Sequence, residues 1–90
     1  MMRAGMKNTG WHEGTIGSPI GSKNPKVARF WVKAYEIGSE YGIDGGKISK
    51  LRIEVDGVAT CNYDRGWDVK PNEDDEITML AYSILLHDYN

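Results

Sequence analysis

Cysteine is almost absent from this chain, and its scarcity excludes several classes of protein. Cys61 is the single cysteine among 90 residues, so no internal disulfide can form and a disulfide-stapled secreted scaffold is excluded. The two histidines, His12 and His87, lie 75 positions apart, and no pair of residues has the spacing of zinc ligands. The strand pairing expected below turns Cys61 inward, where a thiol without a basic neighbour is inert as a nucleophile. We therefore expect no metal site and no catalytic cysteine.

Long apolar runs are also missing. No run approaches the roughly 18 apolar residues that a membrane span requires, and residues 1–10 lack the apolar segment of a secretory signal. We therefore expect no membrane association and a cytoplasmic location. A chain of 90 residues with 40% hydrophobic content is expected to form one small domain. We place this domain at residues 11–90, after a flexible leader over residues 1–10. Because so small a domain has little apolar area for a deep private pocket, a sizeable ligand site is easier to build between subunits, and we expect a homo-oligomer.

Neither sign of charge is in large excess, since the formal net charge is -2. Residues 1–34 carry six Lys or Arg against one acid, whereas residues 35–90 carry five against twelve. The early basic excess is spread along the chain, and a nucleic-acid footprint requires cationic side chains gathered on one face. We therefore do not expect nucleic acid as a direct partner.

Alternation of apolar and polar residues indicates a β-sheet. In the longest alternating stretch, Ala28, Phe30 and Val32 point to one side and form a core face. The opposite side combines basic residues with Trp31 and Tyr35, so it is either half exposed or part of an interface. Three strands are predicted in this first part of the chain, at residues 11–16, 26–37 and 47–54.

The stretch at residues 47–54 has the same two-sided character. It places Leu51 and Ile53 on the core face, together with Ser49. Its other face is charged and carries Lys50, Arg52 and Glu54.

An Asp-Gly turn at residues 56–57 reverses the chain and starts a fourth strand. A two-residue turn would pair Val55 with Val58 and mix the two faces. A three-residue loop with Gly57 in the left-handed bulge position instead keeps Cys61 on the core face. We therefore favour the bulged hairpin. It leaves two polar residues on the outer face, Thr60 and Asn62.

The last segment predicts a helix. After Pro71, Asn72 is a good N-cap, and the acidic residues 73–76 fill the first turn, where the helix dipole favours negative charge. Apolar residues then recur at helical spacing: Ile77, Leu80, Ala81, Ile84, Leu85, Leu86 and Tyr89. The expected fold is α+β, an antiparallel four-stranded meander with one C-terminal helix packed on one face.

A glycine-rich connection at residues 38–47 offers a first set of binding groups. It is not a phosphate-binding P-loop, because Tyr41 and Ile48 stand where that motif requires Gly and Ser or Thr. Its glycines suit turn positions with positive φ ahead of a strand. Lys47 can still reach an anion at the rim of the sheet, and Tyr41 supplies a ring.

The turn at residues 62–67 offers the second set. Arg65 can fork onto a phosphate or carboxylate, and Trp67 can stack on a planar ring. The structural alternative is equally open at this point: Asp64 caps the turn, Arg65 pairs with a nearby acid, and Trp67 packs over the helix.

Other chemically capable residues point to no reaction. His12 and Glu13 are adjacent in a strand, so they face opposite sides of the sheet and are poorly placed to act together. The acidic residues 73–76 lack the alternating ligand spacing of a calcium loop. No nucleophile, base and orienting group converge, and we expect neither an enzyme nor a cofactor.

Three motifs carry a resemblance to a known family: WHEG at residues 11–14, SEYGIDGGKISKL at residues 39–51 and NYDRGWD at residues 62–68. Over residues 11–88 the chain resembles a small uncharacterised domain family of Gram-positive bacteria and their phages. The resemblance brings no established chemistry with it. A phage setting implies a class of tasks, since small proteins of this kind often neutralise a host defence component or its nucleotide signal.

From these observations we expect a non-enzymatic binding protein of the host bacterial cytoplasm that sequesters a small anionic, nucleotide-like ligand. The expected site is the rim formed by the connection at residues 38–47 and the turn at residues 63–67. Its members are Tyr41, Lys47, Asp64, Arg65 and Trp67, with Arg65 and Lys47 on phosphate and the two rings on the base. The alternative is an inhibitor that binds a host defence protein and uses the acidic residues 73–76 to occupy a basic surface.

Overall fold

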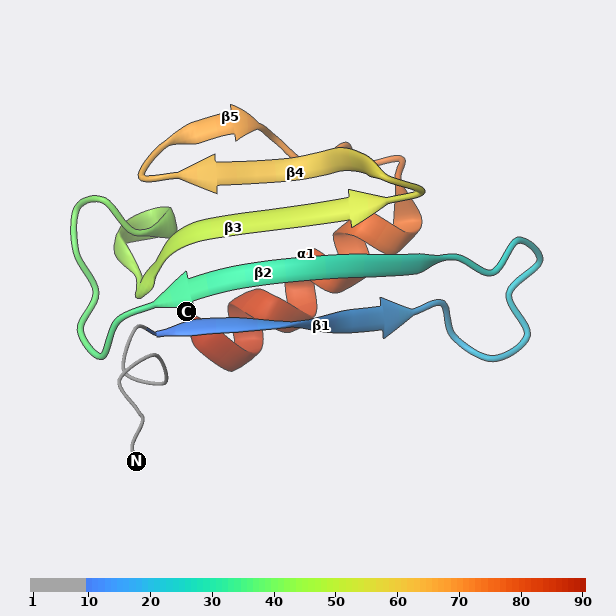
Figure 1. The fold of residues 1–90 in the computed structure, drawn as a ribbon, viewed down its shortest axis with the longest axis horizontal. Helices are drawn as coiled ribbons and strands as arrows, with labels where there is room; N and C mark the ends of the chain where they lie inside the picture. The colour runs from blue at the N-terminus through green and yellow to red at the C-terminus, as the bar shows by residue number, and fades with distance from the viewer. Residues whose placement is uncertain (1–9) are drawn as a thin grey trace.

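The computed structural model describes residues 10–90, which form a five-stranded antiparallel sheet with one helix behind it (Figure 1). The sheet order follows the chain, so the strands form a meander. The α+β class and the meander are confirmed, but the predicted number of four strands is wrong. The leader predicted for residues 1–10 falls, apart from Gly10, outside the described residues. The elements are β1 (Trp11–Gly17), β2 (Val27–Ala34), a 3₁₀ turn η2 (Ile43–Gly45), β3 (Ile48–Val55), β4 (Val58–Asp64), β5 (Trp67–Val69) and α1 (Glu76–Tyr89).

The core lies between the sheet and α1, as predicted. Val32, Leu51 and Ile53 are at most 1% exposed, and Ala81 and Leu85 meet them from the helix. Strand β2 ends at Ala34, three residues before the predicted end. Ile37, which the sequence assigned to this strand, therefore lies beyond it and is 81% exposed. On the helix, Ile84 was assigned to the stripe that covers the core but is 37% exposed.

The hairpin between β3 and β4 differs from the prediction. Asp56 and Gly57 both have positive φ, 54° and 79°, and they form a two-residue turn that pairs Val55 with Val58. The predicted three-residue loop is wrong because the bulge lies further along the ladder. Glu54 pairs with Ala59 and Ile53 with Cys61, so Thr60 is the extra residue that restores the faces.

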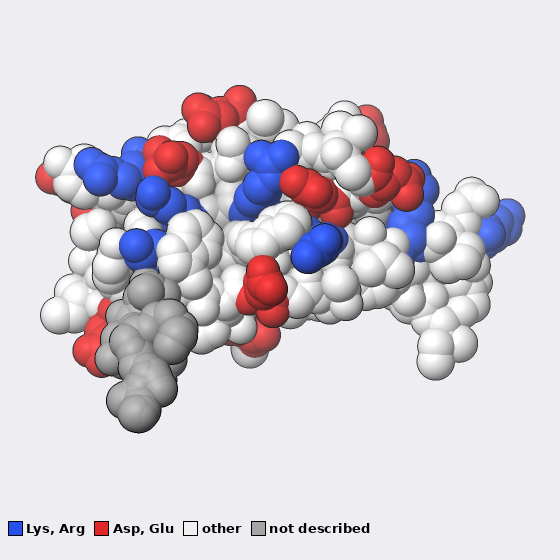
Figure 2. All heavy atoms as spheres, viewed as in Figure 1, with Lys and Arg blue, Asp and Glu red and all other residues white. Residues whose placement is uncertain are grey.

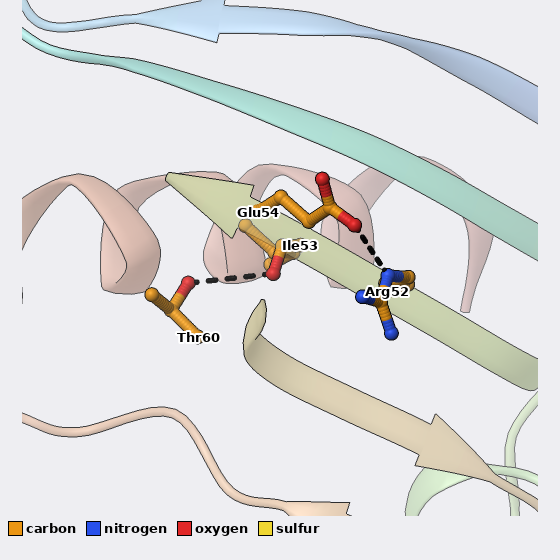
Figure 3. A network of polar contacts seen from close by, with 4 residues as sticks. All are labelled: Arg52, Ile53, Glu54 and Thr60. Atoms are coloured by element: carbon orange, nitrogen blue, oxygen red, sulfur yellow. Dashed lines mark hydrogen bonds and ion pairs between the residues drawn. The ribbon is translucent and has the colours of Figure 1, made fainter. Parts of the chain in front are cut away.

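Thr60 turns toward the helix, and its predicted position on the outer face is wrong. Its Oγ1 lies 2.7 Å from Thr78 Oγ1 on α1 and 3.5 Å from the carbonyl oxygen of Ile53, the contact drawn in Figure 3. Because Thr78 is fully buried, this pair satisfies two hydroxyls between sheet and helix.

The helix begins three residues later than predicted. Asp75 is its N-cap and accepts hydrogen bonds from the backbone N–H of Thr78 at 3.2 Å and from its hydroxyl at 2.7 Å. Asn72 caps a preceding turn instead, where its side chain accepts from the N–H of Asp74 at 2.8 Å. Glu76 is therefore the one acid in the first helical turn.

Strand β5 follows an unusually tight turn. Arg65 has φ 58°, and the N–H of Asp64 donates to the carbonyl of Gly66 at 2.9 Å, so the chain reverses at once and Trp67 pairs with Tyr63. Three residues are too short for an alternation pattern to reveal a strand, which is why the sequence predicted only a turn here.

The end of α1 holds the connection at residues 38–47 in place. The Asn90 amide donates to the carbonyl of Ile43 at 3.1 Å and accepts from the N–H of Ile48 at 2.9 Å. A Cβ on Gly46 would overlap that amide. Within residues 10–90 no helix is both long and apolar enough to cross a membrane.

Candidate functional site

The sheet face opposite α1 carries no covering element among the described residues. We call it the open face, and Figure 2 looks onto it. Side chains of both charge signs are interspersed there with uncharged ones. Alternation along the strands puts on this face the neighbours of buried residues: Trp11, Glu13, Arg29, Trp31, Lys33, Lys50, Arg52, Glu54, Asn62 and Asp64.

Strand register arranges these side chains in rows across the sheet. One row runs from Glu13 through Trp31 and Arg52 to Asn62. The next runs from Trp11 through Lys33 and Lys50 to Asp64. Directly paired residues have Cβ atoms about 5 Å apart, so each row is a continuous strip of contacts.

A groove of about 980 Å³ lies over these two rows. Its walls combine two indoles, from Trp11 and Trp31, with the cationic side chains of Lys50 and Arg52. Small-molecule sites typically measure about 300–1,000 Å³ and are mostly apolar with a few placed polar groups. The groove therefore has the size and the mixture of groups that a small ligand needs. The remaining lining residues are His12, Glu13, Leu51, Glu54, Asn62, Tyr63 and Asp64.

Cations lie over the aromatic rings of the open face. The Lys33 ammonium is 5.7 Å from the ring centre of Trp11 and 5.5 Å from that of Tyr35. The Arg29 guanidinium is 4.9 Å from the ring centre of Trp31. At exposed sites such a contact contributes about 0.5–1 kcal/mol. The contacts hold the rings in place while Trp11 stays 46% exposed.

Arg52 is the cation best placed to bind an anion. Its Nε donates to Glu54 Oε2 at 2.7 Å, as Figure 3 shows, and the two side chains are 45% and 24% exposed. Within the described chain this is its one side-chain hydrogen bond, so the two terminal nitrogens have donors to spare. A guanidinium can use such a fork on a carboxylate or a phosphate.

Lys50 lies beside Arg52 in the neighbouring row. Its ammonium is 3.7 Å from Asp64 Oδ1, and both side chains are more than a third exposed. An exposed pair at that distance contributes little, on the order of 0–1 kcal/mol. An incoming anion can therefore compete for Lys50.

The structure brings together some of the five residues that the sequence assigned to the rim. The Arg65 guanidinium lies 5.1 Å from the ring centre of Tyr41, although 24 positions separate them. The Tyr63 hydroxyl donates to the carbonyl of Tyr41 at 2.8 Å and fixes this approach. Asp64 lies on the open-face groove. Lys47 is exposed, and no hydrogen bond, ion pair or ring contact joins its side chain to the other four described residues.

Trp67 lies on the helix side of the sheet. Its ring packs edge-on against Tyr63 at 4.9 Å between ring centres and against Tyr82 of α1 at 5.8 Å. This is the structural alternative that the sequence left open for this residue, and it separates Trp67 from the groove.

Sequence reasoning recognised the faces of single strands but missed the groove that these strands form together. The charged face of β3 and the mixed face around Trp31 were both recognised from alternation. Trp11 was given no binding role, and its place in the same groove as Lys50 depends on the pairing of three strands. An aromatic residue on the polar face of two successive predicted strands is the signal that could have pointed to this site.

The side chains of Cys61 and His12 lie on the helix side of the sheet, and neither contacts a catalytic partner among residues 10–90. Cys61 is fully buried, and burial raises the pKa of its thiol to about 12. Burial, followed by the charge of Asp44, raises the pKa of Tyr82. His12 stacks on Tyr89 of α1 with 4.7 Å between ring centres, so its ring lies on the helix side of the sheet. Over residues 10–90 no three His, Cys, Asp or Glu side chains gather as metal ligands would.

Comparisons with known proteins bear on the family and not on the site. Neither the curated proteins nor the solved structures gave a match. A family model described as a domain of unknown function, DUF7678, matches residues 10–90, which is nearly the whole chain. The uncharacterised character of the family agrees with the resemblance drawn from the motifs. The chain belongs to the DUF7678 family of domains of unknown function.

Proposed function

We propose that the protein is a non-enzymatic binding module that sequesters a small anionic, nucleotide-like ligand in the open-face groove. One observation carries the proposal: Trp11 and Trp31 share one groove of about 980 Å³ with Lys50 and Arg52. The proposed ligand site lies beside the rim that the sequence favoured, because Trp67, the ring expected to stack on a base, packs against Tyr82.

The groups of the groove suit the two halves of a nucleotide. Trp11 is nearly half exposed and can stack on a base, a contact that typically contributes about 1–3 kcal/mol. The unengaged nitrogens of Arg52 and the weakly paired ammonium of Lys50 can hold a phosphate. Both cations occupy adjacent positions of β3's outer face, so they can reach the same anionic group.

The charge balance of the open face limits the size of the anion. Its four cations face three carboxylates, so the local net charge is +1. A protein that binds a long polyanion neutralises many phosphates with unpaired Lys and Arg, and this face offers few. One or two phosphates therefore fit better than a nucleic-acid strand. The cations are Arg29, Lys33, Lys50 and Arg52, and the acids are Glu13, Glu54 and Asp64.

The proposal is tested by thermal denaturation and titration calorimetry against a panel of cyclic and linear nucleotides, including NAD-derived ones. A ligand at about 100 times its dissociation constant stabilises the fold by roughly 2.7 kcal/mol, which corresponds to a shift of about 10–20 °C in Tm for a domain of this size. If the protein is folded and no nucleotide of the panel shifts its Tm, the proposal is refuted.

Two matched arginine variants locate the site. Arg52→Gln removes the charge but keeps much of the side chain's length, and we expect it to lose binding. Arg65→Gln is the control at the rim, where the guanidinium stacks on Tyr41. If Arg65→Gln loses binding and Arg52→Gln keeps it, the rim is the site and the groove is not. Circular dichroism checks that both variants fold.

The biological setting is a further part of the proposal and rests on the resemblance alone. We propose that the ligand is a nucleotide signal of a bacterial defence system and that the protein acts in the host cytoplasm. A defence-derived signal that shifts Tm while ordinary nucleotides do not would support this setting.

The exposed acids at the start of α1 and just before it support a second candidate, the inhibitor of a host defence protein. Glu73, Asp74 and Glu76 are exposed, whereas Asp75 is occupied as the N-cap. Asp74 and Glu76 also line a recess of about 590 Å³ together with Lys23 and Lys26, so part of this acidic charge faces the chain's own lysines. A complex that weakens steeply with salt and is lost in Asp74→Asn/Glu76→Gln would favour this function.

A further inference from the structure

The first strand of the sheet leaves one of its sides open. β1 is seven residues long and pairs on one side with β2, and no described strand pairs with its other side. The opposite edge strand, β5, has three residues. A long, regular edge presents unpaired N–H and C=O groups, which is a template for pairing with another strand.

The pairing of β1 with β2 shows which backbone groups face outward. The N–H of Ala34 donates to the carbonyl of Gly10 at 3.1 Å, and the N–H of Ser18 donates to the carbonyl of Lys26 at 2.9 Å. These bonds frame a ladder of seven pairs without a bulge. In an antiparallel ladder hydrogen-bonded and non-hydrogen-bonded pairs alternate, so the even-numbered residues bond to β2. Glu13, Thr15 and Gly17 therefore direct their N–H and C=O groups away from the sheet.

β1 has few of the features that usually keep an edge unpaired. Proteins protect edge strands with lysine, proline, bulges or extreme shortness. β1, with the sequence WHEGTIG, contains no lysine, arginine or proline, and Glu13 is its single charge. We take this as evidence that the edge has a partner.

We propose that a second copy of this chain pairs with β1, antiparallel and centred on Gly14, so that the two sheets become one. In this register Glu13 lies opposite Thr15 of the second copy, and Gly14 lies opposite its own equivalent. Glu13 and Thr15 then exchange their outward backbone hydrogen bonds with the second copy, twice by symmetry. The proposal does not rest on the ligand.

Charge and strand length select this register over its neighbours. A register centred on Glu13 would set two carboxylates directly opposite each other, which is destabilising. A register centred on Thr15 would leave Trp11 and His12 beyond the end of the second copy's strand. The register centred on Gly14 pairs all seven residues and places the acid against a hydroxyl. It also puts glycine at the crossing, where a non-hydrogen-bonded pair brings Cα atoms to about 4.5 Å.

Such a pairing has a consequence for the open face. Antiparallel strands related by a two-fold axis perpendicular to the sheet keep both helices on one side and both open faces on the other. The two grooves then lie on one ten-stranded surface, with Glu13 and Trp11 of each copy near the junction. This is how a small domain can extend a shallow site without enlarging its core.

The test is the mass of the protein by light scattering or sedimentation, over a concentration series. We expect the wild type to have the mass of two 10.1-kDa chains. Thr15→Pro removes an outward N–H that β2 does not use, and we expect at least a tenfold rise in the dissociation constant of the dimer. Proline is tolerated on an edge strand in this orientation, and circular dichroism verifies the fold.

A charge exchange tests the register itself. Thr15→Glu sets two carboxylates opposite Glu13 and its equivalent and should weaken the dimer about tenfold. The double variant Glu13→Lys/Thr15→Glu makes both pairs attractive and should restore it. In a register centred on position 13 the double variant would instead oppose two lysines. Asp68→Lys, on the opposite edge strand, is the control and should leave the mass unchanged.

Three outcomes would overturn the proposal. One is a wild-type protein that stays monomeric at millimolar concentration. Another is a folded Thr15→Pro variant that remains dimeric. The third is a dimer that Trp31→Ala dissociates while the Thr15 variants leave it intact, because the open faces and not the edges would then form the interface.

Discussion

Replacing Asp75 with alanine should destabilise the domain more than any other single change among its acidic residues. The carboxylate accepts from both the backbone N–H and the hydroxyl of Thr78, at 3.2 and 2.7 Å. Thr78 is fully buried, and its hydroxyl also meets Thr60 at 2.7 Å. The substitution therefore removes a helix cap and leaves a buried N–H without an acceptor.

The expected cost follows from these two losses. A capping Asp contributes about 1 kcal/mol, and a buried N–H without a partner costs about 1–3 kcal/mol, with the two estimates overlapping because they share one hydrogen bond. We expect a loss of about 2 kcal/mol, or roughly 8–16 °C in Tm. Asn72→Ala is the matched control, because Asn72 caps only an exposed turn, and it should cost no more than about 0.5 kcal/mol.

Urea denaturation followed by circular dichroism measures both variants. A fall in the transition midpoint with an unchanged slope reports stability alone. Asp75→Asn keeps an acceptor and should recover part of the loss. If Asn72→Ala proves as costly as Asp75→Ala, the helix begins where the sequence first indicated, and the role given to the pair of Thr78 and Thr60 is refuted.

Three other changes test the packing around the site. Cys61 should resist a thiol reagent until the protein unfolds. Its pKa of about 12 in the folded protein lies above the value of 9.0 for an unfolded chain, so the wild type should lose stability relative to Cys61→Ala as pH rises from 9 toward 12. Below pH 9 the two proteins should show the same dependence of stability on pH. Trp67→Ala should cost about 2–4 kcal/mol by urea denaturation, and Trp11→Ala less than about 1 kcal/mol, since only the first ring packs against α1; equal costs would contradict their placement. Gly46→Ala should displace the amide of Asn90 and cost about 2 kcal/mol, and adding Asn90→Ala should cost little more, a non-additivity that a double-mutant cycle detects.

The sequence allowed the core faces to be predicted, because alternation assigns a side to each residue within a strand. Val32, Leu51 and Ile53 are buried as expected. Register was not predictable in the same way, since it depends on contacts distant in sequence. The bulge falls at Thr60, whose hydroxyl contacts Thr78 on the helix. The sequence of the hairpin alone does not predict that contact.

The start of the helix shows the same limit of local reasoning. Asn72 and Asp75 are both good N-caps; Asn72 is followed by four acidic residues and Asp75 by one, Glu76, and acids in either first turn suit a helix start. The choice falls on Asp75 because its carboxylate also satisfies the buried hydroxyl of Thr78. A tertiary contact therefore decides between two sequence signals for the start of the helix.

The candidate site was predictable only as separate pieces. Tyr41 and Arg65 were named together and do meet, through a hydrogen bond from Tyr63 that the sequence could not reveal. The side of the sheet on which Trp67 lies depends on the pairing of the short strand β5 with Tyr63. The groove needs the registers of four strands at once, which is why its residues were seen only as polar faces.

The open face must remain stable in water when no ligand is bound, and this requirement sets the affinity that we expect. One helix can cover one face of the sheet, so the indoles of Trp11 and Trp31 are partly shielded by the stems and charges of Lys33 and Arg29 instead. A base that stacks on either ring displaces or shares that cation, at a cost of about 0.5–1 kcal/mol per contact. The net binding free energy from stacking is therefore smaller than the stacking contact alone would give. Tight sequestration would need both grooves of a dimer to act on one ligand, or the phosphate contact with Arg52 to supply most of the binding energy.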